Sequence, residues 1–241
     1  MGGGIAGGLI NTLAGGGSFL VVPLLVMLGL PATVANGTSR VGVFAQSLSA
    51  VAGFRQEGFR DLGAALGILP TLLIASWIGA KLATSADDEL FGRVFGAVML
   101  IALPVILWNP KPRADAAGRP PLAMPLQHAI YLAIGLYSGA IQAGVGIPLT
   151  LALVGAGRLD LVRASSVKVA LTSATTAIAL AQFVWAGKVI WTQGLILALG
   201  MGLGGYFGSR IGARGGEKLL RPALTLCVVL LAIRMLLGGG G

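Results

Sequence analysis

A glycine-rich break interrupts an apolar stretch at two places in the chain, and this feature constrains its fold most strongly. The first break is AGGGS at residues 14–18 and the second is AGVG at residues 143–146. Lipid supplies no water for free backbone groups, so a broken helix at membrane depth is stable only inside protein or beside a cavity. A matched pair of interrupted apolar segments, one in each half, indicates the binding site of a transporter.

The composition is typical of a polytopic membrane protein. Hydrophobic residues make up 56% of the 241 residues and charged residues only 10%, whereas about 25% of the residues of a soluble domain are charged. The net charge of +9 is spread over short loops, which argues against a nucleic-acid partner. The chain has one Cys and one His, so we expect no clustered metal site and no cofactor.

The apolar segments divide the chain into two halves around a linker. In residues 1–108 we expect a pair of short helices within 2–29, then helices at 32–54, 62–83 and 89–108. The stretch 109–125 is Pro-rich and charged, which predicts a linker. In residues 126–237 we expect a second pair of short helices within 127–156, then helices at 160–186, 190–212 and 217–237.

The two halves are related by a shift of 129 residues. Beside the glycine breaks, the shift pairs Gly58 with Gly187, Trp77 with Tyr206, Gly79 with Gly208 and Lys81 with Arg210. One residue of slack pairs Arg40 with Lys168. Internal repeats are typical of transporters, and matches at aromatic and basic positions argue against chance similarity between Gly-rich helices.

Two topologies are compatible with such a repeat. If each broken stretch crosses the membrane once, each half has four spans and the halves are parallel. If each is a re-entrant hairpin, each half has three spans and the halves are inverted. Outside the spans, the first layout divides Lys and Arg eight to seven between the two faces, and the second divides them eleven to four. Short cytoplasmic loops are rich in Lys and Arg, so the charge favours the hairpins.

We therefore predict an all-α polytopic membrane protein with two inverted repeats, each a re-entrant helix hairpin plus three transmembrane helices. The linker 109–125 lies on the cytoplasmic side of the cell (inner) membrane and both termini lie outside. The predicted cytoplasmic residues are Arg55, Arg60, Lys111, Arg113, Arg119, Arg158, Arg163, Arg210, Arg214, Lys218 and Arg221. The predicted outer residues are Lys81, Arg93, Lys188 and Arg234.

The residues just after each glycine break are expected to bind an anion. A second short helix begins there, near Ser18 and near Ile147, and a helix N-terminus carries free N–H groups and a partial positive charge. Ser18 would serve as an N-cap or as a direct donor. Tight packing of small residues is the alternative role for these glycines.

Two basic residues, Arg40 and Lys168, fall inside apolar spans. An ionised side chain in a span is costly and indicates function, although such a chain can also extend to the interface. The eight acidic residues all fall in loops or at span ends, so we expect these two cations to bind an anion. The candidate substrate-binding residues are Gly15, Gly16, Gly17, Ser18, Asn36, Ser39, Arg40, Gln142, Gly144, Gly146, Ser165 and Lys168.

An ordered set of motifs resembles the TauE/SafE family of membrane proteins, which are described as sulfite or sulfonate exporters. The motifs are INTLAGGGSFLVVP at 10–23, ANGTSR at 35–40, SSVKVALTS at 165–173, GKVIW at 187–191, GSRI at 208–211 and GEKLLRP at 216–222. The resemblance implies transport of sulfur-containing anions through a site at 15–18, Arg40, 144–146 and Lys168. Val145 departs from the family pattern, in which a glycine is common there.

The expected function is a secondary transporter that moves small sulfur-containing anions across the lipid bilayer by alternating access. Export is favoured because no acidic residue is available in the spans for proton coupling, and a negative interior drives an anion outward with about 2.3 kcal/mol per 100 mV. An anion channel and uptake of a sulfur oxyanion are the alternatives. An enzyme is not expected, because the spans offer neither a nucleophile–base pair nor metal ligands. The oligomeric state stays open, with a homodimer among the options.

Overall fold

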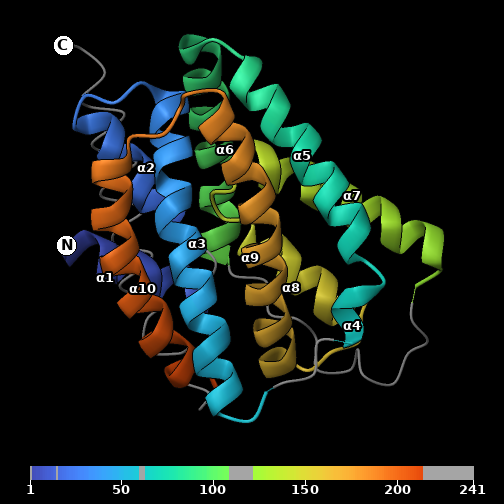
Figure 1. The fold of residues 1–241 in the computed structure, drawn as a ribbon. Helices are drawn as coiled ribbons and strands as arrows, with labels where there is room; N and C mark the ends of the chain where they lie inside the picture. The colour runs from blue at the N-terminus through green and yellow to red at the C-terminus, as the bar shows by residue number, and fades with distance from the viewer. Residues whose placement is uncertain (1, 15, 60–62, 109–121, 214–241) are drawn as a thin grey trace.

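The computed structural model of the chain describes residues 2–14, 16–59, 63–108 and 122–213, which form helices joined by short connections (Figure 1). The helices of the first half are α1 (Gly2–Ala14), α2 (Ser18–Met27), α3 (Ala32–Gln56), α4 (Gly63–Leu66), α5 (Leu69–Ser85) and α6 (Asp88–Trp108). Those of the second half are α7 (Met124–Ala140), α8 (Gly146–Gly155), α9 (Leu161–Trp185) and α10 (Trp191–Ala213).

Two expected boundaries are wrong. The helix expected at 62–83 is divided into α4 and α5, because Gly67 favours a turn and Pro70 starts a new helix well but continues an old one poorly. Helix α7 begins at Met124, inside the stretch expected to be linker, and again a proline occupies its first turn. The helix expected at 217–237 and linker residues 109–121 lie outside the described residues.

Helices α1 and α2 run antiparallel and form a helical hairpin. A Cβ placed on Gly3 would lie 3.5 Å from Leu24 Cδ2, and one on Gly7 would lie 2.9 Å from Val21 Cγ2. The chain therefore reverses at the glycine break and returns along itself. The second break forms the turn at 141–145 between α7 and α8.

The long helices α3 and α9 lie side by side at the centre of the molecule (Figure 1), and each has 25 residues. They run antiparallel, because the Arg40 guanidinium of α3 lies 4.6 Å from the Phe183 ring near the end of α9. Val169, near the start of α9, packs against Phe54, near the end of α3. The two polar faces of these helices are thus brought together.

Both long helices end in the same type of turn. Gly58 follows α3 with φ +92°, and Gly187 follows α9 with φ +68°. Each turn is closed by a backbone hydrogen bond from the next residue back to a phenylalanine carbonyl, at 3.0 Å after α3 and 2.9 Å after α9. A left-handed glycine with this bond is a common helix C-cap, and the two glycines are the pair that the repeat aligns.

Each hairpin packs on a helix from the other half. Helix α1 lies against α10, where a Cβ on Gly8 would lie 2.3 Å from the Met201 carbonyl oxygen. Helix α7 lies against α5, where a Cβ on Gly139 would lie 1.9 Å from the Ser76 carbonyl oxygen. Glycines on the helix faces allow these backbones to approach closely, as is common between helices in membranes.

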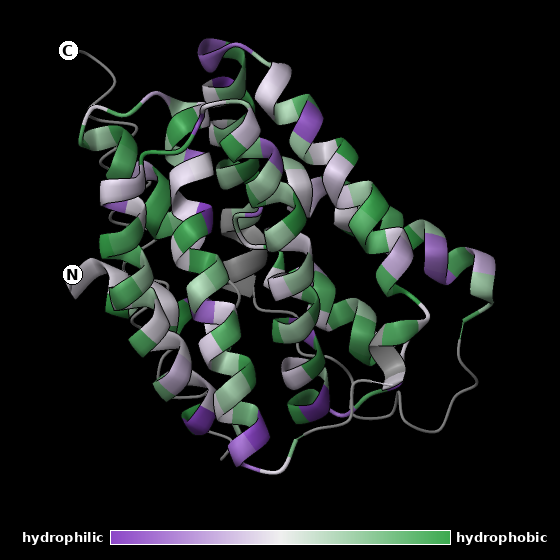
Figure 2. Cartoon of the chain, in the orientation of Figure 1, coloured by the Kyte–Doolittle hydropathy of each residue, from purple (hydrophilic) through white to green (hydrophobic). Residues whose placement is uncertain are grey.

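The outer surface of the bundle is apolar. Ile74 and Leu82 on α5, Ile101 on α6 and Leu199 on α10 are each more than 60% exposed, and hydrophilic residues gather at the helix ends (Figure 2). Among the described residues, only α9 and α10 are long and apolar enough to span a membrane by length and composition alone. A soluble protein rarely exposes so much apolar surface, so this surface fits contact with lipid.

Candidate functional site

The two hairpin turns meet at the centre of the bundle. Gly144, in the second turn, has φ +73°, and a Cβ there would lie 2.2 Å from Cε2 of the Phe19 ring at the start of α2. Only glycine fits this position without strain, because an L side chain disfavours that backbone angle and the ring fills the space. The two turns therefore contact each other through the ring of Phe19 and the backbone of Gly144.

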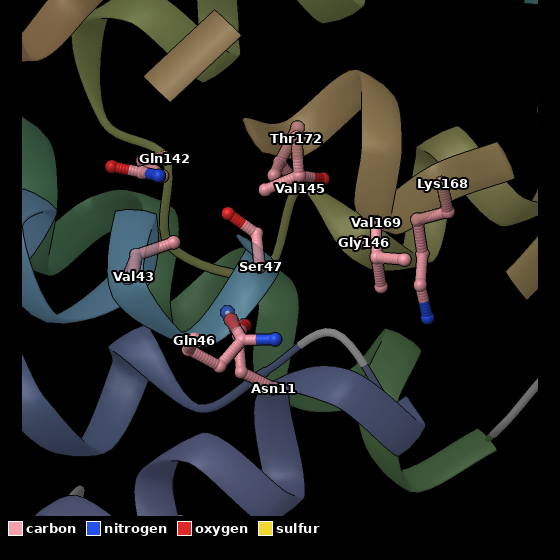
Figure 3. A pocket seen from close by; sticks show the side chains of 10 residues that line it. All are labelled: Asn11, Val43, Gln46, Ser47, Gln142, Val145, Gly146, Lys168, Val169 and Thr172. Carbon is pink, nitrogen blue, oxygen red and sulfur yellow. Dashed lines mark hydrogen bonds between the residues drawn. The ribbon is translucent and has the colours of Figure 1, made fainter. Parts of the chain in front are cut away.

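A small cavity with polar and apolar walls lies next along the chain, lined by Val145 and Gly146 directly after Gly144 (Figure 3). It has room for about one water molecule. Its lining combines both hairpins with the two central helices: Asn11, Val43, Gln46, Ser47, Gln142, Val145, Gly146, Lys168, Val169 and Thr172. Of these residues, only Lys168 is charged, so the cavity presents a cation, amides and hydroxyls between apolar walls.

Polar side chains of the first half form a chain of hydrogen bonds at the cavity. Asn11 Nδ2 donates to Gln46 Oε1 at 2.7 Å, and Gln46 Nε2 donates to Thr12 Oγ1 at 2.7 Å. The Thr12 hydroxyl in turn donates to the Gly8 carbonyl oxygen at 2.9 Å. These bonds tie α1 to α3, and they fix which atoms of Asn11 and Gln46 face the cavity.

Gln142 provides the matching amide of the second half. Its backbone is left-handed with φ 62°, which is strained for a residue with a side chain. Its Nε2 donates to Thr176 Oγ1 at 2.6 Å, and its Oε1 is buried with no hydrogen-bond partner among the described residues. Strain and an unsatisfied polar atom together are typical of a functional position rather than a packing position.

Lys168 brings the positive charge to the cavity. Its side chain extends from α9 toward α1 and is 3% exposed. The ammonium donates to the Thr12 carbonyl oxygen at 3.0 Å, within the last turn of α1. The expectation that this cation lacks a protein partner is therefore wrong. It rested on acidic residues alone and overlooked the free carbonyls at a helix end.

The same correction applies to Arg40, which does not line the cavity. Its guanidinium donates to three backbone carbonyl oxygens at the end of α7, those of Ser138 at 3.2 Å, Gly139 at 2.5 Å and Ala140 at 3.3 Å. Asn36 adds a hydrogen bond to the Ala140 carbonyl at 2.8 Å. Arg40 thus caps the C-terminus of a helix from the other half.

The structure distributes the candidate residues over several places. Gln142, Gly146 and Lys168 line the cavity, whereas Gly144 packs on Phe19. The remaining described candidates are also buried. Gly16, Gly17 and Ser18 lie at the first turn, Asn36 and Ser39 lie close to Arg40 on α3, and Ser165 lies one turn before Lys168. Gly15 lies outside the described residues.

Both short helices begin where expected, near Ser18 and near Ile147, but Ser18 is not an N-cap. Gly17 is the N-cap of α2, so Ser18 is the first helical residue, and no side chain caps this helix. Val145 is the N-cap of α8, which begins at Gly146. The N-terminus of α8 lines the cavity through these two residues.

Four polar residues of the cavity were not among the candidate substrate-binding residues, namely Asn11, Gln46, Ser47 and Thr172. A signal for two of them is present in the sequence. Gln46 and Ser47 follow Ser39 and Arg40 by seven residues, so they share one face of a long helix. Gln46 and Ser47 on that face line the central cavity, which spacing along one helix cannot show.

Comparison with known proteins gives consistent relationships. The sequence profile described as "Sulfite exporter TauE/SafE" matches residues 1–235. A probable membrane transporter protein, ORF9, from Sinorhizobium sp is 27% identical over 231 residues, which cover 95% of this chain and 88% of the relative. No solved structure matches the chain.

Two further relatives share nearly the whole length. A probable membrane transporter protein of Haemophilus influenzae is 25% identical over 238 residues, 98% of this chain and 93% of the relative. The probable membrane transporter protein YfcA of Escherichia coli is 24% identical over 234 residues, 97% of this chain and 87% of the relative. With a family profile that matches almost every residue, the chain belongs to the TauE/SafE family of membrane transporters.

Proposed function

We propose that this protein is a secondary transporter that exports small sulfur-containing anions of the sulfite or sulfonate class by alternating access. The observation that carries the proposal is the lining of the central cavity. A lysine and several uncharged donors face it from both halves, and no carboxylate is among the described residues of its wall.

The donors of this wall suit an oxyanion. Lys168 provides a charged N–H donor, and the side-chain NH2 groups of Asn11, Gln46 and Gln142 each carry a second N–H beside the one already bonded. Hydrogen bonds between a cation and an oxyanion are shorter and about twice as strong as those between neutral groups. Sulfite and the sulfonate group each carry three oxygens, which such a set can bind together.

The size of the cavity favours a carrier over a channel. It has room for about one water molecule, so it must widen to admit sulfite. A closed binding site between two moving parts is what alternating access requires, whereas a channel needs a continuous path. The anion channel therefore remains the second candidate.

We further propose that the halves are inverted repeats in the cell membrane, with the linker on the cytoplasmic side and both termini outside. The antiparallel course of α1 and α2 and of α3 and α9 supports this topology. The charged residues support it as well. Arg210 and Glu57 form an ion pair at 3.2 Å at one end of the bundle, while Lys188 contacts the Ala86 carbonyl at the other end.

Flux from proteoliposomes tests the function. The purified full-length chain is reconstituted, and efflux of sulfite, sulfoacetate, taurine, sulfate and thiosulfate is followed in parallel. We expect saturable efflux that is selective for one or two of these anions. Single-channel currents in a planar bilayer would favour a channel instead, and efflux of none of the anions above the rate of protein-free liposomes would contradict the proposal.

Accessibility of single cysteines tests the topology. In a Cys227→Ser background, Arg55→Cys, Arg163→Cys and Arg93→Cys are labelled in intact cells with a membrane-impermeant maleimide. Inverted hairpins place positions 55 and 163 inside and position 93 outside, so only Arg93→Cys should react. The parallel layout places positions 163 and 93 on one face and position 55 on the other, so equal labelling of 163 and 93 would overturn the inverted one.

A further inference from the structure

The C-terminal end of each broken helix meets a cation from the other half. Helix α7 ends against Arg40 of α3, and α1 ends near Lys168 of α9. In transporters with broken helices, these C-terminal ends and the unwound carbonyls beside them are where coupling cations such as Na⁺ bind. In this protein the two positions are the C-terminal ends of α7 and α1.

At the end of α7, the position is filled by a guanidinium. Nη1 and Nη2 of Arg40 donate to the carbonyl oxygens of Ser138, Gly139 and Ala140, the last three of the helix. The Phe183 ring covers the guanidinium at 4.6 Å, and the side chain is fully buried. Fixed protein atoms thus surround this cation on several sides.

At the end of α1, the position is filled by an ammonium. Thr12 is the third residue from the end of α1, so its carbonyl is one of the four without a partner inside the helix. Lys168 Nζ lies 3.0 Å from that oxygen. This ammonium also faces the central cavity, whereas Arg40 does not.

Electrostatics argues against a further cation at either place. The C-terminus of a helix carries the equivalent of about half a negative charge, and each end already has a full positive charge beside it. A Na⁺ ion 4 Å from either side chain would be repelled by about 4 kcal/mol at an effective dielectric constant of 20. That repulsion corresponds to roughly a thousandfold loss in affinity.

We propose that Arg40 and Lys168 are permanent, covalently attached substitutes for coupling cations, so that the transport cycle carries the anion without Na⁺ or another metal cation. Each turnover then moves the net charge of the anion alone, and the membrane potential drives it. The transport part of this inference rests on the proposed function; the occupation of the helix ends by the two side chains does not.

Exchange of cations on wild-type proteoliposomes tests the transport part. Sulfite efflux is measured with Na⁺ or choline as the variable cation, while a constant K⁺ gradient with valinomycin holds the potential. We expect equal rates within twofold in Na⁺ and choline, and faster efflux when the interior is made more negative. A tenfold or larger fall in choline would overturn the inference.

Thermal stability tests the site without any flux. Removing the guanidinium in Arg40→Ala leaves the α7 carbonyls open to a free cation, so millimolar guanidinium or Na⁺ should raise the Tm of this variant relative to choline. The Tm of the wild type and of Arg55→Ala, a matched change at an exposed arginine, should not depend on the cation. An Arg40→Ala variant indifferent to every cation would contradict the proposal.

Two further arms keep the outcomes separate. If Arg40→Ala does not fold, Lys168→Ala with methylammonium in place of guanidinium gives the same comparison at α1. If the wild type transports none of the anions, the proposed function fails and the Tm comparison alone decides the occupation of the helix ends. If efflux occurs but requires Na⁺, the function stands and this inference fails.

Discussion

The ring of Phe19 packs directly on Gly144, and through this contact the turn of one hairpin lies against the turn of the other. The relationship joins residues 125 positions apart in the chain. The next two residues, Val145 and Gly146, line the central cavity. The contact between the two turns therefore adjoins the wall of the cavity.

Substitution of Gly144 tests the contact. Gly144→Ala should destabilise the protein by about 1–2 kcal/mol through its positive φ and by about 1–3 kcal/mol more through overlap with the Phe19 ring. Gly187→Ala is the matched control, because Gly187 also has a positive φ but a Cβ added there would have no atom within 4 Å. Thermal unfolding in detergent should show the larger loss for Gly144→Ala, and equal losses would mean that the ring is easily displaced.

Lys168 is expected to be required for anion flux. A hydrogen bond to a charged group contributes about 1.5–3 kcal/mol, so Lys168→Ala should reduce the rate of sulfite efflux by about 10- to 150-fold while insertion into the membrane persists. Lys81→Ala, at an exposed position, serves as the control and should transport normally. Wild-type efflux from Lys168→Ala would exclude this side chain from the site.

Gln142 allows function to be separated from stability. Gln142→Gly and Gln142→Ala both remove the amide from the cavity and its bond to Thr176, so both should slow efflux. Only glycine relieves the left-handed backbone, and Gln142→Gly should therefore be more stable than Gln142→Ala by about 1 kcal/mol. The comparison requires Tm and efflux from the same preparations, and a glycine variant that transports like the wild type would show that the amide has no role.

Acidic pH should weaken the attachment of α3 to α6. The Thr33 hydroxyl and N–H donate to Asp88 Oδ1 at 2.5 and 3.0 Å, and the hydroxyl bond lowers the pKa of this carboxyl from its ordinary value of 3.8. Asp88 precedes the span expected at 89–108. A lowered pKa means that the carboxylate stabilises the folded state above the ordinary value, and that this stabilisation is lost as pH falls through the folded pKa.

The variant Asp88→Asn measures that contribution. Its Tm should lie below that of the wild type at pH 7, and the two should converge as the pH falls below about 4. Glu89→Gln is the control, since this neighbouring carboxylate forms an exposed ion pair with Arg93 and such pairs contribute little. A gap between wild type and Asp88→Asn that stays constant with pH would rule out a role for the charge.

Local chemistry in the sequence was enough to locate the two chain reversals. Gly144 marks a turn because glycine tolerates its left-handed backbone. Gly17 marks the other because a Cβ there would lie 2.0 Å from the Gly7 carbonyl oxygen. The long helices were also visible, because neither stretch contains a proline and apolar residues recur on both sides of Arg40 and Lys168. The division between α4 and α5 was not visible in the sequence. A single Gly67 before Pro70 is a weaker indication of a helix break when the residues around it are apolar.

The partners of the two buried cations could not be read from spacing. Arg40 donates to carbonyls that are 98 to 100 residues away in the sequence, and Lys168 donates to the carbonyl of Thr12, which is 156 residues away. Backbone carbonyls carry no sequence signature, because every residue has one. The positions of acidic residues in the sequence therefore do not indicate these carbonyl partners. The bond between Asn11 and Gln46 could not be predicted for a related reason, because it joins two helices whose packing follows from the complete fold.

Helices of one half pack on helices of the other, and this affects when the chain can assemble during synthesis. The first hairpin leaves the ribosome long before α10, yet the glycine face of α1 has its backbone partner there. Until residue 213 is synthesised, that face has only lipid or transient neighbours, so assembly is a late, long-range event of the kind that slows folding. A nascent chain stopped before α10 would leave the first hairpin undocked and open to cellular proteases.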